Sequence, residues 1–215
     1  AVHQGHVDRM KRVLLVDTSM GNLRSVARAL EREGAAVTLS ADPEAVLAAD
    51  RVVVPGQGHF RDCAKALEGG LGEALRAHVD AGKPYLGICL GMQILFERSE
   101  EAEGARGLGL FAGAVRRFPA DLRGEDGRAL KIPHMGWNVV RGDHPLLADE
   151  AWLYFVHSYY CVPEDEALTV GTATYGAPFC AAVARGNVFA CQFHPEKSQR
   201  AGAALLSRFL EDAWS

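Results

Sequence analysis

Short apolar runs recur along the first half of the chain, and each is followed by a turn and then by an amphipathic stretch. They predict strands at residues 12–17, 36–40, 51–54 and 85–88. Mostly aliphatic runs of this length are typical of strands buried on both faces of a parallel sheet. Such strands alternating with helices predict an α/β fold with a doubly wound, mainly parallel central sheet.

The segments between these strands carry the periodicity and the end signals of helices. Apolar side chains recur at helical spacing over residues 23–33, and Gly34 ends the pattern. Asp42-Pro43 is a typical helix N-cap followed by proline at the first helical position. Two further helices are predicted, one from about Phe60 and one over residues 73–81.

In the second half, short strand-like runs follow one another without long helical stretches between them. They cover residues 114–118, 130–140, 152–161, 168–174, 178–184 and 188–193. Gly186-Asn187 separates the last two, and both residues tolerate the positive φ of a tight hairpin turn. This half is therefore predicted to add an antiparallel or mixed β portion to the parallel core. A final amphipathic helix is predicted over residues 198–214.

No internal repeat, low-complexity tract or linker interrupts this pattern, so one domain is predicted over residues 10–215. Residues 1–9 contain two histidines and no hydrophobic pattern, and we interpret them as a short extension or an added remnant. No apolar run reaches the length of a membrane span, and no signal-peptide pattern stands at the start. The net charge of −4 argues against a broad nucleic-acid surface.

Five cysteines are scattered along the chain, and none forms a Cys-x-x-Cys pair. An odd number without metal-ligand spacing favours reduced thiols in a cytoplasmic protein over a disulfide framework or a zinc site. The cysteines are Cys63, Cys89, Cys161, Cys180 and Cys191.

One cysteine has a distinctive setting, because Gly87-Ile88-Cys89-Leu90-Gly91 directly follows an apolar run. This is the sequence form of a nucleophile elbow, in which flanking glycines let a strained residue project from the end of a strand. The start of a following helix would also stabilise a thiolate. The alternative is a buried structural cysteine, which is the commoner fate of a lone thiol.

A cysteine nucleophile needs a base, and the base needs a group that orients it. Among the eight histidines, His194 stands out because it follows the last predicted strand in Gln192-Phe193-His194-Pro195-Glu196. Glu196, two residues later, offers an acceptor that can hold the imidazole tautomer. His-Pro-Glu alone is equally typical of a surface turn, but together with the elbow it indicates a catalytic set.

The segments 87–93 and 192–198, in this order, with a glycine loop at 55–58, resemble the class I (triad-type) glutamine amidotransferases. The resemblance covers the chain from about residue 10 to its end and implies their flavodoxin-like fold. It further implies hydrolysis of glutamine to glutamate and ammonia, without a metal or organic cofactor. In that reaction Cys89 attacks the carboxamide, His194 passes a proton to the leaving ammonia, and Glu196 orients His194. A γ-glutamyl thioester forms and is hydrolysed.

An amide is a poor electrophile, so the reaction also needs an oxyanion site. One donor is expected to be the backbone amide of Leu90, which follows the nucleophile. A second is expected from the loop at Gln57 and Gly58, where glycines allow a peptide flip. By itself a Pro-Gly-x-Gly segment is only a turn.

Three further segments resemble the glutaminase subunits of imidazole glycerol phosphate synthases: residues 20–25, 131–138 and 154–160. In that family they form the first loop, a segment facing the cyclase and the glutamine-binding strand. The resemblance makes Gly58, Gln93, His157, Ser158 and Tyr159 candidates to hold glutamine. Its candidates for the partner interface are Asn22, Pro133, Met135, Trp137 and Lys197.

The resemblance implies a glutaminase subunit that feeds ammonia to a separate (β/α)8 cyclase subunit, as a heterodimer, in histidine biosynthesis. The isolated subunit is expected to be nearly idle, because its glycine loop must reorganise to complete the oxyanion site. Two alternatives remain: the glutaminase of another synthase, of the pyridoxal-phosphate or anthranilate type, or a non-catalytic module on the same fold. The complete set of Cys89, His194 and Glu196 argues against the second.

Overall fold

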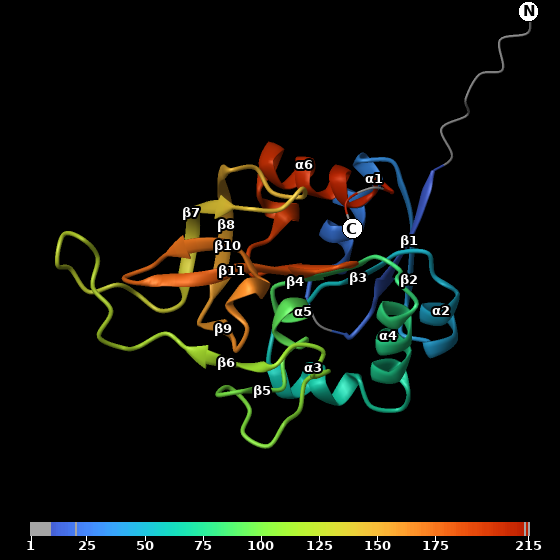
Figure 1. The fold of residues 1–215 in the computed structure, drawn as a ribbon, viewed down its shortest axis with the longest axis horizontal. Coiled ribbons are helices and arrows are strands. Elements are labelled where there is room, and N and C mark those ends of the chain that lie inside the picture. Colours follow the sequence, from blue (N-terminus) through green and yellow to red (C-terminus); the bar gives the residue numbers. More distant parts are fainter. Residues whose placement is uncertain (1–9, 20, 213, 215) are drawn as a thin grey trace, which may run out of the picture.

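The computed structural model describes residues 10–19, 21–212 and 214. The expectation for residues 1–9, and position 20 of the predicted first loop, therefore lie outside the described residues. In the described part of the chain, one mixed sheet of 12 strands runs through the molecule, with helices on both faces of its parallel part (Figure 1). The predicted α/β fold, with a parallel core and an added antiparallel portion, is confirmed.

Five parallel strands form the core of the sheet, in the spatial order β2-β1-β3-β4-β12. They are β1 (Lys11–Val16), β2 (Ala35–Ser40), β3 (Val52–Val54), β4 (Tyr85–Ile88) and β12 (Val188–Cys191). β12 comes from near the end of the chain, and its register pairs Cys191 with Ile88 of β4. Because the carboxyl ends of these strands share one edge, the residues that follow them meet where ligands bind in such sheets.

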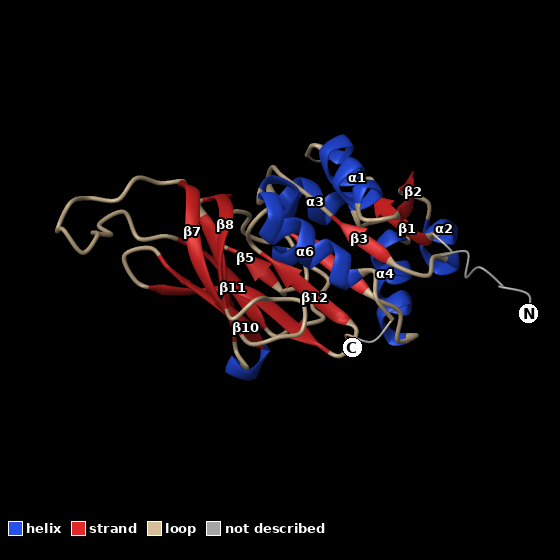
Figure 2. Ribbon diagram, turned by 90° about the horizontal axis from the view of Figure 1, so that it is seen from above, coloured by secondary structure: helices blue, strands red, loops and turns tan. Residues whose placement is uncertain are grey.

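Antiparallel strands continue the sheet from β12 in the order β11-β10-β7-β8. They are β7 (His134–Gly142), β8 (Glu150–His157), β10 (Thr169–Thr174) and β11 (Pro178–Arg185). The predicted hairpin is confirmed, since Arg185 pairs with Val188 and Gly186 has a φ of 55°. Figure 2 shows that these strands extend beyond the part of the sheet over which most helices lie.

The run at residues 152–161, predicted as one strand, is divided at Ser158. β8 ends at His157 and pairs with β7, whereas β9 (Tyr159–Pro163) pairs with β6 (Gly113–Arg117) and touches β11 at one position. A second short strand, β5 (Arg98–Ser99), lies parallel to β6. The division has a physical basis, because the Ser158 carbonyl accepts a hydrogen bond from the Phe118 amide at 3.0 Å instead of continuing the β7 ladder. Residues 157–159 therefore lie where the chain crosses between two branches of the sheet.

The helices cover the two faces of the parallel strands (Figure 1). One face packs against α1 (Leu23–Arg32) and α6 (Gln199–Phe209). The other packs against α2 (Pro43–Ala48), α3 (Phe60–Ala66) and α4 (Leu71–Asp80). Alternation of side chains along the strands explains both cores. In the described part of the chain, no helix combines the length and apolar character needed to cross a membrane.

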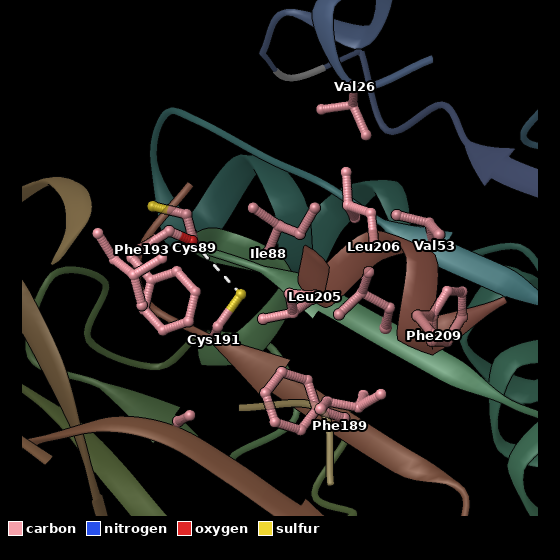
Figure 3. Close-up of a cluster of buried hydrophobic side chains, with 14 of the residues drawn as sticks. Val26, Val53, Ile88, Cys89, Phe189, Cys191, Phe193, Leu205, Leu206 and Phe209 are labelled. Atoms are coloured by element: carbon pink, nitrogen blue, oxygen red, sulfur yellow. Dashed lines mark hydrogen bonds between the residues drawn. The ribbon is translucent and has the colours of Figure 1, made fainter. Parts of the chain in front are cut away.

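The core under α6 extends to the end of β4. Figure 3 shows Leu205, Leu206 and Phe209 of this helix together with Val53 and Ile88 of the sheet, and Cys89 at the edge of the same cluster.

The helix after the elbow is shorter than its apolar pattern indicates. α5 spans only Leu90–Gln93, because the carbonyls of Ile94, Leu95 and Phe96 accept hydrogen bonds from residues 108–111. The helix dipole is therefore expected to contribute little to stabilising a thiolate, since a single turn has few aligned peptide dipoles.

Replacement of Gly91 by alanine is expected to destabilise the fold by about 3 kcal/mol or more, although alanine is the better helix former. A Cβ at Gly91 would lie 1.8 Å from the carbonyl oxygen of Val54, at the end of β3. Urea unfolding of the Gly91→Ala variant measures the loss. The matched control is Gly82→Ala, where φ is +77° but no atom lies within 4 Å of the added Cβ, so only about 1 kcal/mol of backbone strain is expected. Equal losses in both variants would contradict this account.

Candidate active site

Cys89 stands in a strained conformation at the carboxyl end of β4, with φ 54° and ψ −107°. For a residue other than glycine, positive φ is costly and persists only where the surroundings impose it. Here the Cys89 amide donates to the Cys191 carbonyl at 2.8 Å, and Gly91 packs on Val54, so the backbone is held on both sides. The side chain lines a cavity while the residue is only 7% exposed. This is the geometry that the elbow pattern predicts.

His194 and Glu196 come from the turn after β12. The Nδ1 atom of His194 lies 2.7 Å from the Oε1 atom of Glu196, and both side chains are almost completely buried. The short 3-10 helix η2 (Pro195–Lys197) fixes the spacing, and the His194 amide donates to the Tyr154 carbonyl at 2.9 Å. The other ring nitrogen, Nε2, is buried and forms no hydrogen bond with any residue that the structure describes. Nε2 is therefore available to give or accept a proton.

The surroundings of His194 favour its imidazolium form. Burial by itself lowers the pKa of His194, but attraction to the Cys89 thiolate, together with the bond to Glu196, raises the pKa to about 10. A cysteine, a histidine and a carboxylate that orients the histidine thus stand in the order that activates a cysteine for attack on a carbonyl.

A cavity of about 390 Å³ opens at Cys89. Most of the predicted site residues line it: Gln57, Gly58, Cys89, Leu90, Gln93, Pro133, His157, Ser158, Tyr159 and Lys197. Three lining residues were not among the named candidates: Glu101, and Tyr154 and Val156 of the segment 154–160 that resembles a glutamine-binding strand. Tyr154 and Val156 share a face of β8, so alternation along that strand could have found them. Glu101 lies in a charged loop whose sequence gives no such signal.

The predicted oxyanion loop holds a carbonyl, not an amide, toward Leu90. The Leu90 amide donates to the Gly56 carbonyl at 3.3 Å. The two ends of a peptide group point in opposite directions, so the Gln57 amide faces away from Leu90. It lies instead against Gly21, where a Cβ would be 2.9 Å from the Gln57 nitrogen. The oxyanion role of Leu90 and Gln57 stays a prediction, and it requires a flip of the Gly56–Gln57 peptide to aim both amides at one point.

Gln192 contacts the cysteine sulfur and was not predicted as a site residue. Its Nε2 atom lies 3.5 Å from the Cys89 sulfur, and its Oε1 atom accepts a hydrogen bond from Gln93 at 3.2 Å. The contact follows from the register, because Gln192 and Cys89 each follow one member of the Cys191–Ile88 pair. The only signal in the sequence was that Gln192 precedes Phe193 and His194.

The interface candidates separate into two groups. Pro133 and Lys197 line the cavity, whereas Met135 and Trp137 lie on the outward face of β7, 62% and 43% exposed. Asn22 is at the N-cap of α1, where its side chain accepts from the Ser25 amide at 3.3 Å. Their roles in partner binding stay predictions, although exposed Met and Trp side chains on one strand face are typical of interfaces.

The sequence matches the family model "Glutamine amidotransferase class-I" over residues 14–213. The chain belongs to this family. It is 54% identical to "Imidazole glycerol phosphate synthase subunit HisH" of Methylococcus capsulatus, over 96% of this chain and 99% of that protein. The protein of the same description from Syntrophotalea carbinolica is 48% identical over 92% and 98% of the two chains.

Solved structures with low sequence identity share the fold. "Structure of PurLQS from Thermotoga maritima" matches with a TM-score of 0.68 and 21% identity, over 94% of this chain and 98% of that chain. The glutaminase domain of Trypanosoma brucei CTPS, with bound acivicin, matches with a TM-score of 0.62 and 16% identity, over 95% and 96%.

Acidification is expected to destabilise the folded protein through His157. Burial, as the largest cause, lowers the pKa of His157 from 6.5 to about 3. Between these values the unfolded chain binds a proton that the folded chain does not, so stability falls as the pH falls below about 6.5. The loss from this residue is about 2 kcal/mol at pH 5.

Urea unfolding at pH 7 and pH 5 measures this loss in the parent protein and in His157→Gln. The variant should lose less stability on acidification, because its side chain does not titrate. An equal loss in both proteins would show that His157 is not the group responsible.

Proposed function

We propose that this chain is the glutaminase subunit of an imidazole glycerol phosphate synthase, hydrolysing L-glutamine and passing ammonia to a cyclase subunit in histidine biosynthesis. The observation that carries the reaction is the buried His194–Glu196 pair beside Cys89, whose side chain lines a cavity of about 390 Å³. The choice among glutaminases is supported by the 54% and 48% identity to two HisH proteins over nearly the full length of the chains.

The geometry suggests how the reaction proceeds. The Cys89 thiolate attacks the side-chain carbonyl carbon of glutamine, and Nε2 of the His194 imidazolium donates its proton to the departing ammonia. The carbon–nitrogen bond breaks and a γ-glutamyl thioester remains. Neutral His194 then takes a proton from water, which attacks the thioester and releases glutamate and the thiolate, restoring the imidazolium. Glu196 keeps Nδ1 protonated throughout, so that Nε2 performs both transfers.

The lining of the cavity offers polar groups that can bind the amide and the charged ends of glutamine. Gly58, Gln93, His157, Ser158 and Tyr159 remain our candidates to hold the substrate. Glu101 adds a partly buried carboxylate, which accepts the Phe60 amide and still has lone pairs for the α-ammonium group of an amino acid.

The orientation of the glycine loop supports an idle isolated subunit. With the Gly56 carbonyl bonded to Leu90, a developing oxyanion would meet a negative dipole instead of a second donor. A flip of the Gly56–Gln57 peptide reverses this and completes the site. Gly21, which directly precedes Asn22, lies against the Gln57 amide. A partner bound at Asn22 would therefore contact the neighbour of the residue that packs on the peptide that must flip.

The exposed side chains of Met135 and Trp137 provide an apolar face for the cyclase, which we propose to be a separate (β/α)8 barrel in the cytoplasm. The competing proposal, a glutaminase for another synthase, predicts the same chemistry with a different partner. Co-purification with the cyclase separates the two proposals.

The Cys89→Ala variant is expected to lose glutamate release by about 10³-fold or more, because the thioester no longer forms. Glutamate is measured in the presence of the cyclase and its ligand. The matched control is Cys180→Ala, a buried cysteine of β11 that does not line the cavity, which should retain activity within about 3-fold. Retained activity in the Cys89 variant would refute the assignment.

Addition of the cyclase and its ligand to the parent chain is expected to raise glutamate release by about 10²- to 10³-fold, the usual effect of one oxyanion donor. The Trp137→Ala variant should weaken this activation. The control Leu39→Ala, an exposed side chain of β2 at the opposite edge of the sheet, should not. Equal rates with and without the cyclase would contradict both the idle state and the partner.

A further inference from the structure

A chain of four hydrogen-bonding groups leads from β7 to His157 and Tyr159, which line the cavity. The Nδ2 atom of Asn138 lies 3.3 Å from Nε2 of His134, and Nδ1 of His134 lies 2.9 Å from Nε2 of His157. Nδ1 of His157 in turn lies 2.7 Å from the carbonyl oxygen of Tyr159. His134 and His157 are directly opposite each other in the β7–β8 ladder, so the backbone itself sets their separation.

The two ends of this chain fix the direction of every donor. The Tyr159 carbonyl only accepts, so His157 carries its proton on Nδ1 and accepts on Nε2. His134 must then donate from Nδ1 and accept on Nε2. Asn138 supplies the required donor, because its Oδ1 accepts the Val139 amide at 2.8 Å and leaves Nδ2 as the donor. Both ends therefore demand the same arrangement, with each histidine neutral and in the Nδ1–H form.

The environment favours these neutral forms. Burial lowers the pKa of His134 to about 4 and, as the largest cause, that of His157 to about 3. The ring of His134 is stacked between Tyr175 and Phe155, at centroid distances of 4.2 and 4.8 Å, which prevents it from turning. A protonated His157 would place two N–H groups face to face.

The Tyr159 carbonyl is also tied to the nucleophile. It accepts a second hydrogen bond, at 3.3 Å, from Gln93, whose Nε2 atom also bonds Gln192, the residue in contact with the Cys89 sulfur. The position of this one carbonyl thus depends on His157 from one side and on Gln93 from the other. The chain from β7 therefore ends on the groups that surround the reacting sulfur.

We propose that His134 and Asn138 are positioning residues of the glutamine site: they hold His157 on the Tyr159 carbonyl, and thereby hold residues 157–159 and the Gln93–Gln192 pair in place. Neither residue lines the cavity, so they act through others. That these residues belong to a glutamine site rests on the proposed function, whereas the direction of the hydrogen bonds along the chain does not. β7 also carries Met135 and Trp137 on its opposite face, so the same strand serves the pocket and the surface.

The first test is independent of activity. Nitrogen-15 spectra of the histidine side chains in the full chain at pH 7 report the tautomer of each ring. The expected result is the neutral Nδ1–H form for both His134 and His157. An Nε2–H tautomer or an imidazolium at either position would overturn the proposal.

The second test uses the complex with the cyclase and its ligand. His134→Phe keeps an aromatic ring but removes both hydrogen bonds, and kcat/KM for glutamine should fall about 10- to 100-fold, mainly through KM. His134→Gln retains one donor and one acceptor and should recover most of the loss. The matched control is His78→Phe, which removes a buried histidine bonded to the Pro84 carbonyl outside the site, and it should leave KM unchanged.

A His134→Phe variant with the kinetics of His78→Phe would overturn the proposal. If His134→Phe does not fold, Asn138→Ala removes the first donor at a half-buried position, and an unchanged KM and unchanged His157 tautomer there would overturn it equally. Absence of glutamine hydrolysis in the parent complex would instead defeat the proposed function, while the spectra still decide the hydrogen-bond chain.

Discussion

The close packing of three backbone segments at the carboxyl edge of the sheet is the constraint on which the site depends. The start of α5 lies so near the end of β3 that no side chain fits at Gly91, and Gly87 is similarly close to the Gly91 carbonyl. This contact forces the chain to turn sharply at Cys89 and to accept a positive φ there. The strained turn places the Cys89 side chain at the edge of the core cluster, where it also lines the cavity.

The pKa values of the two buried histidines near Cys89 shift in opposite directions because their partners differ, although burial lowers both. His194 is attracted to Cys89 and Glu196, and this attraction outweighs the loss of hydration, so the pKa of His194 rises. His157 has only a neutral ring and a carbonyl as hydrogen-bond partners, so burial prevails and its pKa falls. One site thus contains an imidazole suited to proton transfer and another suited to holding a fixed hydrogen bond.

The crossing of the chain at Ser158 connects two branches of the sheet. Because β8 and β9 belong to different branches of the sheet, residues 157–159 are not absorbed into one continuous ladder and can line the cavity. At the same crossing, His134 of β7 forms a hydrogen bond with His157. The antiparallel half is therefore part of the glutamine site that we propose, and not only an addition to its scaffold.

The sequence by itself determined the alternation of strands and helices, the elbow at Cys89 and the His-Pro-Glu turn, because local spacing and turn chemistry encode each of them. It also carried the resemblance that proved to be the family. Only the tertiary structure decided that α5 is one turn long, that residues 152–161 divide at Ser158, and that Gln192 touches the sulfur. Each of these depends on hydrogen bonds or strand register between distant segments, and local patterns do not record which distant partner a backbone group will find.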